Sequence, residues 1–187
     1  IADSVSQKLT IEGVYSNDYM QYVNVNNPVF LKSRFKNINF NNNSNTDKIK
    51  DAMFVHCRIA ETIHLIKNCS ASLINCIVNC PSSSDNKTSN FEITNCVVYD
   101  YSNVRASSYI NCVLISGSNY NSLVRLSSSC SAYNNISNNA GSFYEIPNNT
   151  NRTVEKIETI FKTYKGGRFE DLDSENFELT DAAKAKY

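Results

Sequence analysis

The sequence predicts an all-β fold, a parallel β-helix solenoid of about six coils that ends in a short C-terminal amphipathic helix and a capping segment. Three observations predict this fold class. A short phrase recurs at nearly even intervals, Asn and Ser together supply 52 of the 187 residues, and Gly and Pro number only 5 and 3. Asn and Ser favour turns and helix caps over helix interiors, so this composition disfavours a helical bundle.

The recurring phrase places apolar side chains on two short strands. An apolar or aromatic residue comes three positions before a reference residue, and the position two after the reference residue is again apolar. A step of two keeps side chains on one face of a strand, whereas a step of three does not, so the chain has to bend just before the reference residue. The reference residues follow one another at a period of about 20 residues, which is typical of a solenoid. They are Ile38, Cys57, Cys76, Cys96, Cys112 and, in a weaker copy, Asn134.

The residue before each reference residue is predicted to make this bend. Asn adopts the left-handed conformation more readily than most residues that carry a side chain, and one left-handed residue turns a strand sharply. The predicted bend residues are Asn37, His56, Asn75, Asn95 and Asn111. Coils joined in this way stack about 4.8 Å apart. We therefore expect a column of Asn side chains along one edge and a column of Cys side chains inside the stack, where no coil buries its core alone.

With this phrase the chain resembles the pectate-lyase-like proteins, and among them the secreted or surface β-helix proteins of anaerobic gut bacteria. The resemblance covers roughly Leu9 to Ile136. The segments Ile160–Gly167 and Asn176–Ala183 also resemble the end of such proteins, where a helix and a final strand close the solenoid. The resemblance implies a right-handed coil and an extracellular or cell-surface location in a bacterium. It implies little about activity, because one fold hosts many activities.

A leucine-rich repeat is the alternative fold, since its consensus also uses Asn or Cys at a fixed position. The positions eight and three before the reference residue fit that consensus in part, as at Val104 and Tyr109. The position five before does not fit, because Leu is replaced there by Ser33, Ala52, Ala71 and Ser107. The chain also has only nine Leu. The β-helix is therefore the favoured fold.

Local patterns predict the segments on either side of the repeat. Lys8–Val14, Tyr22–Val25 and Val29–Leu31 are apolar runs that read as strands of a longer first coil. Residues 41–47 and 81–90 are rich in Asn, Ser and Asp and read as turns, and residues 137–152 read as a polar loop.

A helix is predicted at Thr153–Tyr164, because its apolar residues follow a helical period and its acidic residues come early. The apolar residues of this segment are Val154, Ile157, Ile160, Phe161 and Tyr164. We therefore divide the chain into the β-helix, residues 1–150, and a C-terminal helix and capping segment, residues 151–187.

One outward-facing column is unusually apolar. The residue after the reference residue is predicted to face solvent, and in three consecutive coils it is Ile77, Val97 and Val113. A contiguous apolar stripe on a protein surface is normally covered. Two alternatives remain for what covers the stripe: the chain's own C-terminal helix or a second copy of the chain.

The cysteine pattern predicts free thiols. The seven cysteines include no C-x-x-C pair, and an odd number argues against a complete set of disulfides. Cys76 and Cys80 have no His at a matching spacing, so neither a metal site nor a cofactor is expected. The cysteines of the column are expected to behave as small buried hydrophobic residues.

Few residues suit acid–base catalysis. Of the two histidines, His56 falls at a predicted bend, and His64 lies in a predicted strand with little acid nearby. Glycosidases need two carboxylates on either side of the scissile bond. The acids between residues 69 and 142 fall at different places in the coil and are Asp85, Glu92 and Asp100. We therefore assign no catalytic residue.

Charge and hydropathy exclude two classes of partner. The 18 basic and 18 acidic residues give a formal net charge of zero, so the basic excess of a nucleic-acid-binding domain is absent. The longest apolar runs are only a few residues, which is too short to span a membrane.

Basic and aromatic residues are the candidates for ligand binding. Arg105 and Arg125 lie one repeat period apart and Lys50 matches Arg105 in the repeat, so a basic column is predicted that suits an acidic glycan. Tyr99 and Tyr101 are predicted near a coil corner, where they suit stacking against sugars. The predicted function is that of an extracellular or cell-surface, non-enzymatic protein that is glycan-binding or adhesin-like, with a polysaccharide as partner. The alternative is a polysaccharide lyase or glycoside hydrolase of the pectate-lyase-like type.

Overall fold

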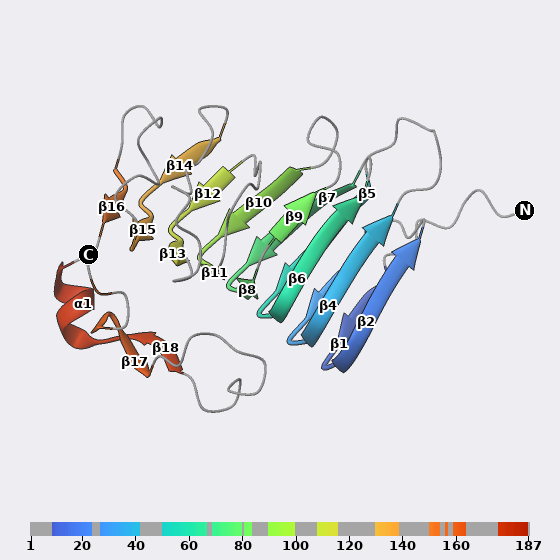
Figure 1. The fold of residues 1–187 in the computed structure, drawn as a ribbon, viewed down its shortest axis with the longest axis horizontal. Coiled ribbons are helices and arrows are strands. Elements are labelled where there is room, and N and C mark those ends of the chain that lie inside the picture. Colours follow the sequence, from blue (N-terminus) through green and yellow to red (C-terminus); the bar gives the residue numbers. More distant parts are fainter. Residues whose placement is uncertain are drawn as a thin grey trace, which may run out of the picture.

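Two parallel sheets wound into a solenoid make up most of the structure (Figure 1). It is a computed structural model that describes residues 9–23, 27–41, 50–66, 69–79, 81–83, 90–99, 108–115, 130–138, 150–153, 156, 159–163 and 176–186. Each strand pairs in parallel with a strand of the next coil, for example Phe54 in register with Leu73 and Leu73 with Ile93. The chain therefore alternates between the two sheets as it advances along the stack.

The seven-stranded sheet has the order β1-β3-β5-β7-β10-β12-β14. Its strands are β1 Thr10–Glu12, β3 Val29–Leu31, β5 Lys50–Val55, β7 Cys69–Ile74, β10 Asn90–Thr94, β12 Ser108–Ile110 and β14 Ser131–Tyr133. The nine-stranded sheet has the order β16-β15-β13-β11-β8-β6-β4-β2, with β9 also paired to β6. Its strands are β2 Tyr15–Val23, β4 Arg34–Asn41, β6 Arg58–Ile66, β8 Ile77–Asn79, β9 Pro81–Ser83, β11 Val97–Tyr99, β13 Val113–Ile115, β15 Ile136–Ser137 and β16 Arg152–Thr153.

The fold class predicted from the sequence is confirmed, since the structure is an all-β parallel solenoid with one short C-terminal helix among the described residues. The predicted number of six coils rests on a count of the recurring phrase. The first coil, formed by β1 and β2, lacks that phrase, so the number of phrases does not give the number of coils.

A two-residue bend joins each strand of the seven-stranded sheet to the following strand of the nine-stranded sheet. The first bend residue has a positive φ in every case, because only a left-handed residue turns the chain so sharply and returns it to the extended conformation. These residues are Gly13 (70°), Lys32 (46°), His56 (53°), Asn75 (53°), Asn95 (54°), Asn111 (54°) and Asn134 (54°). Their side chains are exposed along one edge of the solenoid, which we call the bend edge.

The expectation for Asn37 does not hold. Asn37 lies inside β4, and the bend of this coil is at Lys32. The register of β4 with β6 shifts between Phe35 and Asn37, where three residues of β4 face four residues of β6. Phe35 and Ile38 are both buried in the core although they are three residues apart. This irregularity produces the same apolar step as a bend. In the weaker last copy, Asn134 is the bend residue rather than the reference residue.

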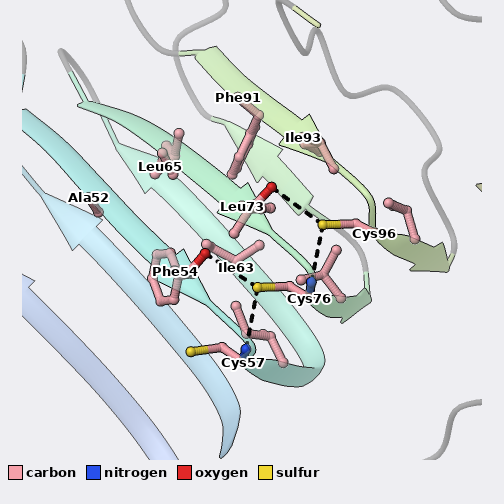
Figure 2. Packing of buried hydrophobic residues seen from close by; sticks show 14 of the residues in the cluster. Ala52, Phe54, Cys57, Ile63, Leu65, Leu73, Cys76, Phe91, Ile93 and Cys96 are labelled. Atoms are coloured by element: carbon pink, nitrogen blue, oxygen red, sulfur yellow. Dashed lines mark hydrogen bonds between the residues drawn. The ribbon is translucent and has the colours of Figure 1, made fainter. Parts of the chain in front are cut away.

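Stacked columns of apolar side chains fill the interior (Figure 2). The rings of Phe30 and Phe54 are parallel with centroids 4.8 Å apart, which matches the spacing between coils. Leu73, Ile93 and Tyr109 continue this column, and all of them are fully buried. Each coil contributes only a few such residues, so the core exists only when the coils are stacked.

The second residue of each bend forms a hydrogen-bonded column inside the stack. The buried members are Ser33, Cys57, Cys76, Cys96, Cys112 and Asn135. The backbone N–H of Cys57 donates to Sγ of Cys76 over 3.4 Å, and the N–H of Cys76 donates to Sγ of Cys96 over 3.3 Å (Figure 2). Each thiol in turn donates to a backbone carbonyl of the preceding coil, Cys76 to Phe54 and Cys96 to Leu73, both over 3.4 Å. The column therefore ties the bends at Cys57 and Cys76 to the coils on both sides.

Oxygen atoms take the place of sulfur at the two ends of this column. Ser33 Oγ accepts from a backbone N–H of the first coil over 3.2 Å. Asn135 Oδ1 accepts from the N–H of Cys112 over 2.8 Å, and Asn151 Oδ1 accepts from the N–H of Asn135 over 2.9 Å. The position thus needs a compact side chain that accepts and donates hydrogen bonds. Describing its cysteines as small hydrophobic residues leaves out this role.

The cysteines of the described residues are free, buried thiols, and they are Cys57, Cys69, Cys76, Cys96, Cys112 and Cys130; Cys80 lies outside the described residues. Burial raises the pKa of Cys112 to about 11, against an opposing effect of backbone hydrogen bonds. The hydrogen bond with Cys57 lowers the pKa of Cys76, but the bond with Cys96 and burial outweigh it and raise that pKa to about 12. These thiols stay protonated at neutral pH and keep the proton that the column needs.

The C-terminal segment differs from the predicted helix at Thr153–Tyr164. β16 continues the nine-stranded sheet, and β17 (Phe161–Thr163) pairs antiparallel with β18 (Asn176–Leu179). Aromatic and β-branched residues suit a strand, and pairing with β18 decides in its favour. The predicted helical contacts at Val154 and Ile157 lie outside the described residues.

The helix of the described residues is α1, Asp181–Lys186, which follows β18. Thr180 caps it, since its Oγ1 accepts from the N–H of Ala183 over 3.2 Å. Glu178 of β18 lies 2.8 Å from Nζ of Lys162 and 3.1 Å from Nζ of Lys184, so it links β17, β18 and α1. These two lysines lower the pKa of Glu178.

This C-terminal segment covers the apolar stripe. Ile77, Val97 and Val113 lie in register on neighbouring strands, as expected for one column. Ile160 and Phe161 pack with them in one buried cluster, which also includes Val97, Tyr99, Ile115, Ala183 and Leu179. The cover is therefore the chain's own hairpin and α1, in place of the longer helix that was predicted.

We expect the solenoid to lose stability between about pH 9 and pH 12. The folded pKa values of Cys76 and Cys112 lie above the unfolded value of 9.0, so their contribution is complete below pH 9 and is lost as the pH rises towards the folded values. Each such thiol lowers the unfolding free energy by about 1.4 kcal/mol per pH unit in this window. Urea unfolding followed by circular dichroism at pH 7, 9 and 10.5 measures the slope.

The variant Cys76→Ser/Cys112→Ser is the matched control, because Ser keeps a donor and an acceptor but does not titrate in this range. It should show a shallower loss of stability, since titration of Tyr and Lys is common to both proteins. Equal slopes in the two proteins would contradict the assignment of this pH dependence to Cys76 and Cys112.

Loosening the C-terminal cover should expose the apolar stripe. Phe161→Ala removes a buried ring and should weaken docking by roughly 3 kcal/mol. We expect the variant to bind an apolar dye and to self-associate in sedimentation velocity, with the β-sheet circular dichroism unchanged. Thr163→Ala, an exposed position of the same strand, is the control and should behave as wild type. A monomeric Phe161→Ala variant that binds no dye would refute the covering role.

Candidate functional site

Of the five ligand-binding residues predicted from the sequence, the structure describes only Lys50 and Tyr99. Arg105, Arg125 and Tyr101 lie outside the described residues, so the predicted basic column is not tested. Lys50 is the first residue of β5, in register with Cys69 of the seven-stranded sheet. Tyr99 is only 5% exposed, because it belongs to the cluster under the C-terminal cover. Tyr99 is therefore no platform for a sugar ring.

Among the described residues two grooves lie on the bend edge, and the larger of the two lies beside the last coils. We call it the amide groove; its volume is 650 Å³, and it is lined by Asn111, Cys112, Val113, Asn134, Asn135, Ile136, Thr150, Asn151, Arg152 and Leu179. The side chains of Asn135 and Asn151 are held in the buried column. Asn111, Asn134 and Arg152 are exposed and available to a ligand.

The repeated bend explains why amides gather in this groove. The left-handed conformation places Asn at successive bends, and parallel stacking brings Asn111 and Asn134 onto neighbouring coils. The N–H of Asn134 donates to Oγ1 of Thr150 over 2.8 Å, which fixes the wall of the groove. A primary amide both donates and accepts hydrogen bonds, as sugar hydroxyls do. The groove is therefore equipped to bind a polar, uncharged ligand.

The second groove lies on the same edge towards the N-terminus, and we call it the basic groove. Its volume is 390 Å³, and it is lined by Lys32, Ser33, Arg34, His56, Cys57, Arg58, Asn75 and Ile77. Lys32 and His56 are bend residues of neighbouring coils, and Arg34 and Arg58 are in register on β4 and β6. Two adjacent coils thus direct their basic side chains into one hollow.

Exposed aromatic residues lie on β2. Tyr15 and Tyr19 are 61% and 58% exposed, and the hydroxyl of Tyr19 accepts a hydrogen bond from Nδ2 of Asn39 on β4. Tyr15 is in register with Arg34, so it extends the outward column of the basic groove by one coil. His64 lies in register with Asn39 on the same sheet, and partial burial lowers its pKa.

Sequence reasoning missed both grooves for an identifiable reason. The bend of the first copy of the repeat was placed at Asn37, so Lys32 was not recognised as a bend residue and Arg34 was not placed next to Arg58. The signal was present, because Lys32 follows Gly13 at the same interval at which Asn75 follows His56. The amide groove was missed because the column continues past Asn135 to Asn151 with a step of only 16 residues.

No group of three or more His, Cys, Asp and Glu side chains in the described part of the chain is arranged to hold a metal ion. None of the helices within the described ranges has the length and apolar character needed to cross a membrane.

Comparisons with protein-family models, with curated proteins and with solved structures give no match for this chain. We therefore infer the function from the residues of the two grooves.

Replacing Lys32 by Asn should stabilise the protein. Lys is poorly suited to the left-handed conformation that Lys32 adopts, whereas Asn occupies four other bends. The exposed ion pair with Glu12, 3.0 Å long, contributes little. We expect Lys32→Asn to raise the unfolding free energy by roughly 0.5–1 kcal/mol. Thermal and urea unfolding measure this gain, with Lys36→Asn inside β4 as the control, which should show no gain. An unchanged or lowered stability of Lys32→Asn would contradict the strain at this bend.

Proposed function

We propose that this chain is a non-enzymatic, extracellular or cell-surface solenoid that binds a glycan in the amide groove. The observation that carries the proposal is the pair of exposed bend amides, Asn111 and Asn134, on neighbouring coils beside Arg152. Each amide suits a hydroxyl pair on a sugar ring. Leu179 supplies an apolar wall for the ring face.

The rigidity of the groove supports binding. The amides are carried by bends that are hydrogen-bonded to the coils on both sides, for example from the N–H of Asn111 to the carbonyl of Tyr133 over 3.0 Å. A preformed site loses less conformational entropy when a ligand binds. The lining consists of amide, hydroxyl, basic and apolar groups, which bind sugars, whereas hydrolysis uses a pair of carboxylates.

The state of the thiols is compatible with a location outside the cell. Reactive cysteines are exposed and have lowered pKa values, whereas Cys76 and Cys112 are buried and have raised ones. Their hydrogen-bonded column does not depend on a reducing compartment. An extracellular or cell-surface location in a bacterium therefore remains our proposal.

A polysaccharide lyase is the second candidate, and one observation favours it. His56 lies in the basic groove with Arg34 and Arg58, and an imidazole next to cationic side chains suits proton abstraction from an acidic sugar. Products with new unsaturated or reducing ends, assayed with and without Ca²⁺, would establish this alternative and contradict the non-enzymatic proposal.

The binding proposal is tested with the full chain and a panel of neutral oligosaccharides, namely cellotetraose, xylotetraose and mannotetraose, by calorimetry. Asn111→Gly/Asn134→Gly removes both amides while Gly keeps the positive φ of the bends. We expect wild type to bind at least one oligosaccharide and this variant to bind it at least tenfold more weakly. Asn95→Gly changes the same bend position outside both grooves and should bind as wild type. Equal binding by all three proteins would refute the amide groove as the site.

A further inference from the structure

We propose that the basic groove is a second binding site, specific for the anionic groups of a polysaccharide, with Arg34 and Arg58 holding a carboxylate or a sulfate ester. This inference rests on the glycan-binding function proposed above and names the chemistry of a separate site. It is carried by the geometry of the two coils that form the groove.

Arg34 and Arg58 are held side by side by the fold. They are register partners on the parallel strands β4 and β6, so their Cα atoms belong to adjacent coils about 4.8 Å apart. Both side chains end in a guanidinium group, which binds carboxylate or sulfate oxygens in a bidentate manner.

The lining of this groove carries positive charge and no negative charge. The chain has 18 basic and 18 acidic residues, yet the eight residues that line the groove include Lys32, Arg34 and Arg58 and no Asp or Glu. Glu12 pairs with Lys32 over 3.0 Å at the margin, and both side chains of this pair are more than half exposed. Such an exposed pair is easily displaced by a ligand anion.

The bend residues of the groove depart from the pattern of the other bends. Gly or Asn occupies Gly13, Asn75, Asn95, Asn111 and Asn134, whereas the two bends of this groove carry Lys32 and His56. Lys is an unfavourable residue at positive φ. Residues that break a local rule are expected at functional positions. Here both exceptions add basic side chains to one hollow.

In the basic groove a ligand has to be bound by side chains, because the backbone N–H groups already donate hydrogen bonds within the protein. The N–H groups of Lys32, His56 and Arg58 donate to carbonyls of Val55, Ile74 and Ser33 over 2.9–3.1 Å. Ser33 and Cys57 are buried in the column and form the floor. An anion is therefore held by the basic side chains of the rim, which makes its binding sensitive to salt.

The test measures binding of three tetrasaccharides to the full chain by calorimetry at low and high salt. The probes are a hyaluronan tetrasaccharide with carboxylates, a carrageenan tetrasaccharide with sulfate esters, and uncharged cellotetraose. We expect one or both anionic probes to bind more tightly than cellotetraose, with affinity falling at high salt. Which anionic probe binds identifies the group that is recognised.

Arg34→Gln/Arg58→Gln should weaken anionic binding at least tenfold, and Lys32→Asn/His56→Asn should weaken it several-fold with the bends retained. Lys156→Gln is the control, because Lys156 is an exposed basic residue that lines neither groove and should leave anionic binding unchanged. Circular dichroism confirms that each variant is folded. Equal binding of charged and neutral probes, or an unchanged affinity of Arg34→Gln/Arg58→Gln, would overturn the proposal.

The proposals for the amide groove and the basic groove can be refuted independently of each other. Loss of neutral binding on Asn111→Gly/Asn134→Gly concerns only the amide groove, and loss of anionic binding on Arg34→Gln/Arg58→Gln concerns only the basic groove. Anionic binding that Lys156→Gln weakens as much as Arg34→Gln/Arg58→Gln does would indicate general charge attraction and would overturn the inference.

Discussion

The whole fold depends on satisfying the backbone where each coil bends. A two-residue bend interrupts the regular pairing of the sheets and leaves an N–H inside the stack, and an unpaired buried N–H is expensive. The next coil supplies the acceptor, as Sγ of Cys76 does for Cys57 and Oδ1 of Asn135 does for Cys112. The same side chains return a donor to the preceding coil. The bends at Cys57, Cys76 and Cys112 are therefore completed by the neighbouring coils, which couples the hydrogen bonds of the bends to the stacking of the apolar core.

This coupling also shapes the surface. Because the bends are fixed in register, the residue after the buried column falls on one outward line, from Tyr15 through Arg34, Arg58, Ile77, Val97, Val113 and Ile136 to Arg152. Its apolar middle is closed by the C-terminal hairpin and α1. Its two ends stay open and border the basic groove and the amide groove. One line of side chains thus combines a covered centre with two polar hollows, and the function we propose lies in those hollows.

The sequence predicted the features that repeat and missed those that occur once. The Asn-Cys phrase marked the bends at Asn75, Asn95 and Asn111 because residue type and spacing agree there. It failed at Lys32, where neither bend residue matches the phrase, and a register shift after Phe35 leaves Phe35 and Ile38 buried with the same apolar step. The hairpin was missed because Ile160 and Phe161 fit the apolar stripe of a helix and are equally able to fill the buried cluster under the hairpin. The grooves were missed because they depend on which residues stacking brings together, and an error of a few residues in one copy moves Arg34 away from Arg58.

The most direct test of this account compares two substitutions at Cys96, whose Sγ accepts from the N–H of Cys76 over 3.3 Å and donates to the carbonyl of Leu73 over 3.4 Å. Cys96→Ser keeps both hydrogen-bonding functions, whereas Cys96→Val keeps an apolar side chain and leaves the N–H of Cys76 without its acceptor. Urea unfolding at pH 7 should show Cys96→Val to be less stable than Cys96→Ser by roughly 1–3 kcal/mol. A Val variant as stable as the Ser variant, or more stable, would show that the column acts by hydrophobic packing alone and would contradict the central role of its hydrogen bonds.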